Sequence, residues 1–277
     1  MKLPREQLEA LSQRLREVSQ AWRPEGEEDA KAVATAAGLL PRRRLHEWLG
    51  VTSPLKTEEP QGRAERTIWV PAMAMLMEGA IKAWSSGGGL VIWIGSAVWP
   101  YGASLPAAVI GDSVMVQTQS MADRVWAIDL ALRSKAVTAV IADGSGLTLP
   151  ATRRLQLAAE AGRALALLAR PSHEMKQRSA AAYRWLVRHG RSAGEGGEGG
   201  QFSRDRPCWS VELLRGKEGR LMNGSVVEGA TSGSERLNVT WPSQAARGLV
   251  EWHHGQGLIS LPAVVGSTTA TAQKQFA

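Results

Sequence analysis

The stretch GVTSPLKTEE, residues 50–59, carries the clearest chemical signal in the sequence. It fits the phosphate-binding pattern G-x-x-x-x-G-K-[ST] at Gly50, Lys56 and Thr57, but Leu55 stands where the pattern has its second glycine. Such a loop works because its backbone N–H groups turn toward a phosphate while the lysine neutralises charge. The stretch is therefore a candidate nucleotide site with one defect in its pattern.

Neighbouring residues weaken this candidate further. Leu55 is bulky where glycine supplies a conformation that side chains resist, and Pro54 removes an N–H donor. Glu58 and Glu59 follow in place of the expected helix, and their carboxylates would repel a phosphate. We therefore expect no ATP turnover and no cofactor, and residual binding of ATP with magnesium is the open alternative.

One residue argues in the other direction. Asp143 ends an apolar run predicted as a strand, where P-loop ATPases keep the aspartate that helps to hold magnesium. No water-activating carboxylate follows the predicted strand LVIWIG, because Gly95 and Ser96 occupy that end. The degenerate nucleotide site thus consists of Gly50, Lys56, Thr57 and Asp143.

Other chemistry is scarce. His253 and His254 are adjacent, so on a strand they would point to opposite faces and make poor joint metal ligands. The single cysteine, Cys208, excludes an internal disulfide and a cysteine-based zinc site. Glu47 is expected to be structural. We assign no catalytic residue and no metal ligand.

Composition indicates a soluble protein that prefers acidic partners. The 277 residues are 44% hydrophobic and 21% charged, and the formal net charge of +7 favours nucleic acid or acidic proteins. No apolar run approaches transmembrane length, and the start of the chain lacks the apolar region of a secretory signal. A cytoplasmic location is the expectation.

Residues 1–37 are predicted to be a helical segment. Apolar residues recur at three- and four-residue steps from Leu8 to Trp22, which predicts an amphipathic helix. Its apolar stripe could pack on the chain's own core or dock on another chain. A second short helix is expected over residues 29–37, and Arg42–Arg44 are expected to be a solvated approach to the first strand.

Residues 38–171 alternate between predicted strands and helices, which predicts an α/β domain with a mostly parallel sheet flanked by helices. Continuous apolar runs such as LVIWIG indicate strands buried on both faces. Strands are predicted at 45–49, 90–95, 114–119, 136–143 and 164–169, and helices at 71–84, 121–135 and 150–162.

Residues 172–266 are predicted to be a strand-rich extension of the same domain, and residues 267–277 a disordered tail. Antiparallel strands are expected at 183–188, 209–214, 237–241, 249–252 and 258–261. The flexible run GEGGEGGQ, residues 194–201, is flanked by basic residues that could contact single-stranded DNA or form only a solvated surface. These residues are Arg188, Arg191, Arg204 and Arg206.

Five stretches also carry a family resemblance, in the same order along the chain. They are LHEWLG, VIWIGSAVWPYGASLPAAVIG, ADRVWAIDLALRSKAVTAVI, LTLPATRRLQLAAEAGRALALLARP and WSVELLR. Together they resemble ImuA, the RecA-like family of the bacterial inducible mutagenesis cassette, over most of residues 38–262. RRLQLAAEAG is the most specific of these matches. The resemblance implies a RecA-like core that lacks a complete nucleotide site.

The resemblance also implies a non-catalytic role in SOS-type DNA damage tolerance, supporting error-prone translesion synthesis. The partners it implies are ImuB, a polymerase-fold protein lacking catalytic residues, RecA, and an error-prone DNA polymerase alpha subunit. The chain departs from the family in keeping Lys56, Thr57 and Asp143 and in carrying a long insertion at residues 215–236. An ATP-dependent RecA-type DNA-binding ATPase and a cell-division inhibitor like SulA are the alternatives.

Overall fold

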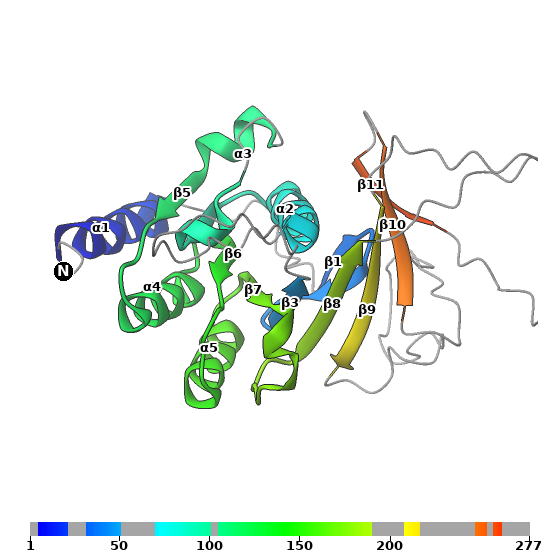
Figure 1. Cartoon of the computed structure of the whole chain (residues 1–277). Coiled ribbons are helices and arrows are strands. Elements are labelled where there is room, and N and C mark those ends of the chain that lie inside the picture. The colour runs from blue at the N-terminus through cyan, green and yellow to red at the C-terminus, as the bar shows by residue number, and fades with distance from the viewer. Residues whose placement is uncertain are drawn as a thin grey trace, which may run out of the picture.

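The computed structural model describes residues 5–21, 32–50, 70–100, 105–189, 208–216, 247–253 and 257–261, most of which belong to one mixed sheet or pack on it (Figure 1). Within these ranges its parallel strands are β3 (Leu45–Gly50), β4 (Leu90–Ile94), β5 (Ser113–Val116), β6 (Val137–Asp143), β7 (Leu165–Pro171) and β8 (Tyr183–His189). The antiparallel strands that extend it are β9 (Cys208–Gly216), β10 (Arg247–His253) and β11 (Gly257–Leu261). The strand order is β11-β10-β9-β8-β3-β7-β6-β4-β5.

The strand β4 forms where the sequence is continuously apolar, since helices cover both faces of the central parallel strands. Every residue of β3, β4 and β7 is buried. The helix α2 (Val70–Ser85) and the short α3 (Ala107–Gly111) pack on one face, and α4 (Met121–Arg133) and α5 (Leu149–Ala161) pack on the other (Figure 1). The predicted α/β fold, with a mostly parallel sheet, flanking helices and antiparallel additions, is confirmed.

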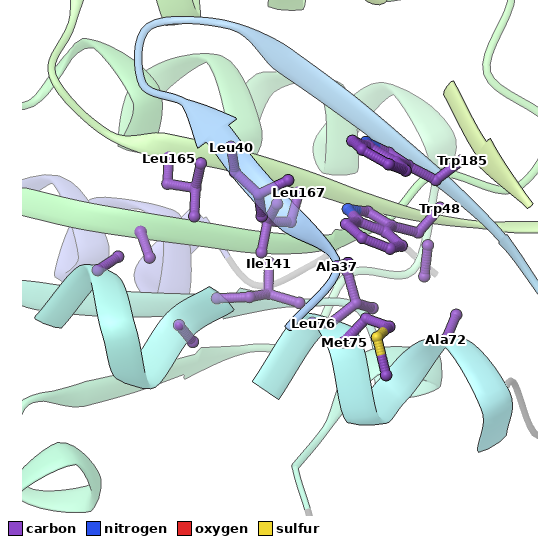
Figure 2. Packing of buried hydrophobic residues seen from close by; sticks show 14 of the residues in the cluster. Ala37, Leu40, Trp48, Ala72, Met75, Leu76, Ile141, Leu165, Leu167 and Trp185 are labelled. Carbon is purple, nitrogen blue, oxygen red and sulfur yellow. The ribbon is translucent and has the colours of Figure 1, made fainter. Parts of the chain in front are cut away.

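Alternate residues of each strand divide between two hydrophobic cores. Trp48, Trp93 and Leu167 point to the core under α2, and their neighbours Ile92 and Leu168 point to the core under α4 and α5. In the first core, the rings of Trp48 and Trp185 stack with centroids 5.1 Å apart, above the α2 turns that carry Ala72 and Met75 (Figure 2). These two tryptophans, like Trp93 and Trp209, are buried and serve packing.

The N-terminal helix α1 (Arg5–Ala21) confirms the amphipathic pattern. Leu11 and Leu15 are each only 4% exposed and belong to the same core as Ile128 and Leu132 of α4. Packing on the chain's own core is therefore what the structure shows for these two leucines, and docking on another chain stays a prediction. Among the helices that the structure describes, none is long and apolar enough to cross a membrane.

The short helix predicted over residues 29–37 is wrong. The chain forms an antiparallel hairpin there, with β1 (Ala32–Thr35) paired to β2 (Gly38–Pro41). The alanine-rich sequence favours a helix locally, but Gly38 has a φ of 112°, which other residues rarely adopt. The hairpin also buries Val33 and Leu40 against the first core, so tertiary packing decides the local structure.

The arginines after the hairpin are not merely a solvated approach. Arg42 donates through Nη2 to the carbonyl of Ala83 at 2.9 Å, in the last turn of α2. Arg43 donates through Nε and Nη2 to the carbonyl of Glu160 at 3.1 and 2.8 Å, in the last turn of α5. Cations at helix C-termini satisfy free carbonyls and oppose the helix dipole, so these residues clamp helices on both faces of the sheet.

The orientation predicted for the strand at 183–188 is also wrong, because β8 runs parallel to β3. Residues 172–182 contain only the 3-10 helix η3 (Ser172–Lys176) and no α-helix. They nevertheless lead the chain from the carboxyl end of β7 back to the amino ends of the parallel strands, where β8 begins. The antiparallel extension therefore begins at β9. Several predicted segments lie outside the described residues: the strand at 237–241, the stretches at 51–67 and 194–201, the part of the 215–236 insertion that follows Gly216, and the tail.

Two ionisable groups, one partly buried and one fully buried, hold the hairpin. Glu78 of α2 accepts the Ala36 N–H through Oε1 at 2.9 Å, while its Oε2 is buried and has no hydrogen-bond partner among the residues that the structure describes. Burial raises the pKa of Glu78 from 4.5 to about 7. Burial lowers the pKa of His46 from 6.5 to about 4, and the neutral ring donates from Nε2 to the Pro41 carbonyl at 2.9 Å.

Replacing Glu78 with glutamine should flatten the dependence of stability on pH. The folded carboxyl binds its proton more tightly than the unfolded chain, so the free energy of unfolding falls as the pH rises from 4.5 to about 7. Glutamine keeps an acceptor for Ala36 and cannot ionise. From pH 5 to pH 8, the free energy of unfolding of Glu78→Gln should rise by roughly 1–3 kcal/mol relative to that of the wild type, measured by urea unfolding. In the exposed control Glu9→Gln, the free energy of unfolding should differ from that of the wild type by the same amount at pH 5 and at pH 8. The same result for Glu78→Gln would contradict a contribution of the Glu78 carboxyl to the pH dependence.

Candidate functional site

Ligands of open α/β sheets bind beyond the carboxyl ends of parallel strands, where neighbouring strands send their connections to opposite faces. Here β3 and β4 are followed by α2 and α3 on one face, while β5 and β6 are followed by α4 and α5 on the other. β4 meets this condition with both of its neighbours, β6 and β5, and β3 meets it with β7, whose connection is bound by α5. Two of these places hold ion pairs that lie largely out of solvent, one between β4 and β6 and one between β3 and β7. We call them the β4–β6 junction and the β3–β7 junction.

At the β4–β6 junction, the carboxylate of Asp143 is fully engaged. Its Oδ1 accepts the Ser145 N–H at 2.9 Å and the Ser145 hydroxyl at 2.6 Å. Its Oδ2 accepts from Nη1 of Arg124 in the first turns of α4, and Nη2 of the same guanidinium donates to the Ser145 carbonyl at 2.9 Å. The side chains of Asp143 and Arg124 are each only 13% exposed. The ion pair therefore lies largely out of solvent.

Gly95 closes the same junction from the β4 side. Its φ is 94°, and a Cβ placed on it would lie 2.9 Å from the Cβ of Asp143 and 3.8 Å from the Cδ of Arg124. Real Cβ atoms do not approach so closely, so residue 95 cannot carry a carboxylate without displacing Asp143. The glycine that the sequence places after β4 is thus required by the geometry of this junction.

The structure places part of the predicted nucleotide site. Gly50 ends β3 opposite Pro171 of β7, and Asp143 ends β6 opposite Ala169 of β7, so the two residues lie at the same edge with one strand between them. Lys56 and Thr57, like Leu55, lie outside the described residues. The predicted phosphate cradle is therefore neither assembled nor excluded by the structure.

The β3–β7 junction contains a buried ion network that sequence reasoning largely missed. Arg170 donates through Nη1 to Glu47 at 2.7 Å and through Nη2 to Glu174 at 2.6 Å, and Arg184 donates through Nε to Glu47 at 2.8 Å. The side chains of Arg170 and Glu47 have no exposed area. We call Glu47, Arg170, Glu174 and Arg184 the Glu47 network.

The network is balanced in charge and rich in hydrogen bonds. Its two carboxylates face its two guanidinium groups, and Ser179 donates to Glu47 at 2.6 Å while Gln177 accepts from Arg170 at 2.9 Å. Buried charges are tolerated only when they are paired and hydrogen-bonded in this way. Each of the four charged groups makes at least two hydrogen bonds to other described residues, which is the pattern of a site that fixes the polypeptide around it.

The segment that the network fixes is the connection from residue 172 to residue 182. Thr152 and Gln156 of α5 accept the N–H groups of Ala180 and Ala182 at 3.0 and 3.1 Å. Arg215 of β9 donates to the carbonyls of Ser179, at 3.1 Å, and Ala181. Side chains thus satisfy the backbone groups that an α-helix would have satisfied internally.

Two signals could have revealed the network in the sequence. Arg170 directly follows the predicted strand 164–169 at the end of the apolar run ALALLAR, and Arg184 stands within the predicted strand 183–188. An arginine in a strand buried on both faces requires a buried anion, and Glu47 stands in the strand LHEWLG. The expectation that Glu47 is structural agrees with its contacts, whereas its partners were not recognised.

The predicted DNA-binding residues are only partly placed. Arg188 lies in β8 and donates to Glu212 of β9 at 3.0 Å, with 43% of its side chain exposed. Arg191, Arg204 and Arg206 lie outside the described residues. His253 ends β10, while His254 lies beyond the described part of the chain, and no group of three His, Cys, Asp or Glu residues suited to a metal is found within that part.

Comparison with known proteins adds no identification. No protein-family model matches the sequence, and no curated protein matches it.

Replacing Glu47 with glutamine should destabilise the fold strongly. Two buried arginines would share one carboxylate in place of two, and removing one partner of a buried pair typically costs about 3–5 kcal/mol. Urea unfolding at neutral pH should show this loss. The control Arg188→Gln breaks a half-exposed ion pair with Glu212 and should cost about 1 kcal/mol or less. Equal losses in the two variants would mean that the network does not fix the connection.

Proposed function

We propose that this chain is a non-catalytic RecA-like accessory protein that supports error-prone translesion synthesis through protein contacts. The observation that carries the proposal is the ion pair of Asp143 with Arg124 at the β4–β6 junction. In a P-loop ATPase the corresponding carboxylate helps to hold magnesium, whereas here both of its oxygens are taken by protein donors.

The fold supports the proposal through its strand order. The parallel part of the sheet runs β8-β3-β7-β6-β4-β5, so the strand before the P-loop-like stretch and the strand ending in Asp143 flank β7. This arrangement brings Gly50 and Asp143 to one edge, as a nucleotide-binding ancestor would require. Fold alone does not define function, so the specific role rests on the ImuA resemblance of residues 38–262.

An ATP-dependent RecA-type ATPase is the competing function, because the chain keeps Lys56, Thr57 and Asp143. Pro54 and Leu55 argue against it, since they remove a donor and a glycine conformation from the phosphate cradle. Gly95 argues against it at the other end, because the junction has no room for a water-activating carboxylate there.

We expect the purified chain to hydrolyse ATP no faster than its Lys56→Ala and Asp143→Asn variants, with or without magnesium. A phosphate-release assay at saturating ATP measures this directly. Turnover that depends on magnesium and is lost in Lys56→Ala would favour the ATPase instead. Loss in Lys56→Ala alone, with Asp143→Asn active, would show that the lysine acts without the β4–β6 junction.

Partner capture tests the accessory role itself. The tagged chain, recovered from cells exposed to a DNA-damaging agent, should retain an ImuB-like protein, RecA and the error-prone polymerase alpha subunit. Nuclease treatment before capture separates protein contacts from bridging by DNA, and the proposal predicts that these proteins persist. Recovery of a tubulin-like division protein would favour the SulA-like alternative, and recovery of none of these partners would contradict the accessory role.

A further inference from the structure

We propose that the guanidinium group of Arg124 takes the place of a divalent cation at Asp143, so that the β4–β6 junction is neutralised by the chain itself. The inference rests on the proposed non-catalytic function, because it gives a physical reason why this edge of the sheet would not take a metal-bound nucleotide. It assigns to Arg124 a role as a built-in cation, in addition to its contribution to packing.

The donor set around Arg124 is the kind that a hard cation prefers. The guanidinium contacts the carboxylate of Asp143 and the carbonyl of Ser145, and the Ser145 hydroxyl lies 3.5 Å from its Nη1. Carboxylate, carbonyl and hydroxyl oxygens are the ligands of magnesium and manganese in proteins. The guanidinium group of Arg124 lies near three such oxygens and so occupies the position that a metal ion would take between them.

The start of α4 holds Arg124 in this position. The Ser120 hydroxyl accepts the Asp123 N–H at 3.1 Å and donates to the Asp123 carboxylate at 2.6 Å, which fixes the first turn of the helix. Gly146 carries a φ of 72°, and a Cβ there would lie 2.8 Å from Cε of Met121. The helix start and the loop after β6 therefore fit closely around the ion pair.

Arg124 and a divalent cation cannot share Asp143. Both side chains are 13% exposed, and Gly95 limits the junction on the β4 side. A second cation would face the guanidinium at short range in a medium that screens charge poorly, and this repulsion would oppose its attraction to the single carboxylate. Moreover, Nε of Arg124 is buried with no partner among the residues described, a cost that a purely stabilising ion pair need not carry.

The experiment uses Mn²⁺ alone as the probe, with binding to the full chain followed by the loss of the free-ion electron paramagnetic resonance signal. The wild type should show no binding that depends on Asp143. Arg124→Ala should bind one Mn²⁺ at least roughly tenfold more tightly than the wild type, because a positive charge next to the carboxylate has been removed. Arg124→Ala combined with Asp143→Asn should return to the wild-type level, and Arg124→Lys, which keeps the charge, should resemble the wild type.

A matched control uses an ion pair on the neighbouring surface. Arg154→Ala removes a cation from Asp129, whose carboxylate still receives Arg133, and should create no Mn²⁺ site. Arg124→Ala is also expected to lower the melting temperature, and Mn²⁺ should recover part of that loss because a ligand of the folded state stabilises it. This melting measurement gives the same answer for Arg124→Gln if the alanine variant folds poorly.

Three results would overturn the inference. The first is Mn²⁺ binding by the wild type that is lost in Asp143→Asn. The second is that neither Arg124→Ala nor Arg124→Gln gains Mn²⁺ binding or a Mn²⁺-dependent rise in melting temperature, and the third is that such a gain survives the addition of Asp143→Asn. None of them bears on partner capture, so the accessory function can stand when this inference fails. Conversely, a gained metal site in Arg124→Ala would stand even if no translesion partner were recovered.

Discussion

Four charged side chains buried at the β3–β7 junction determine how the chain leaves the parallel sheet. Arg170 and Arg184 place positive charge inside the protein, and Glu47 and Glu174 neutralise it at hydrogen-bond distance. Because desolvating any one of these groups alone would be costly, the strands and η3 that carry them are fixed relative to one another. The connection from residue 172 to residue 182, which contains no α-helix, therefore has a defined path, and β8 enters the sheet parallel to β3. The antiparallel strands β9, β10 and β11 of this sheet are built outward from β8.

The two junctions are physically linked. Glu174 accepts the Gly146 N–H at 2.8 Å, and Arg170 donates to the Leu147 carbonyl at 3.1 Å. The loop after β6 is thus held between the Glu47 network on one side and the pair of Asp143 with Arg124 on the other. The charges of the two ion clusters sum to zero, since three carboxylates face three guanidinium groups: Glu47, Glu174 and Asp143 with Arg124, Arg170 and Arg184. The net charge of +7 must act from other surfaces.

The elements that could be predicted from sequence are those in which local pattern and burial agree. Strands such as LVIWI are buried on both faces, so an apolar run was sufficient evidence for them. The alanine-rich residues before Gly38 favour a helix by their local pattern, and nothing in that pattern indicates that they pack against α2 as a strand. The direction of β8 and the partners of Glu47 depend on contacts more than 120 residues apart, such as that of Arg170 with Glu47. Asp143 was recognised from its place at the end of an apolar run, whereas Arg124 lies on a predicted helix 19 residues earlier, and nothing local marks it as the partner of Asp143.

The state of Asp143 illustrates how a nucleotide-binding fold could lose its ligand and remain stable. In P-loop ATPases, the carboxylate at the end of this buried strand is compensated by the magnesium ion that it helps to hold. Once Pro54 and Leu55 weaken the cradle, that compensation is lost and the carboxylate would be left desolvated and unpaired. A cation supplied by the adjacent helix restores the balance without any ligand, at the cost of one unsatisfied Nε. Under the proposed non-catalytic function, the ion pair of Arg124 with Asp143 is the expected physical consequence of losing the metal, and a return to nucleotide binding would depend on breaking that pair.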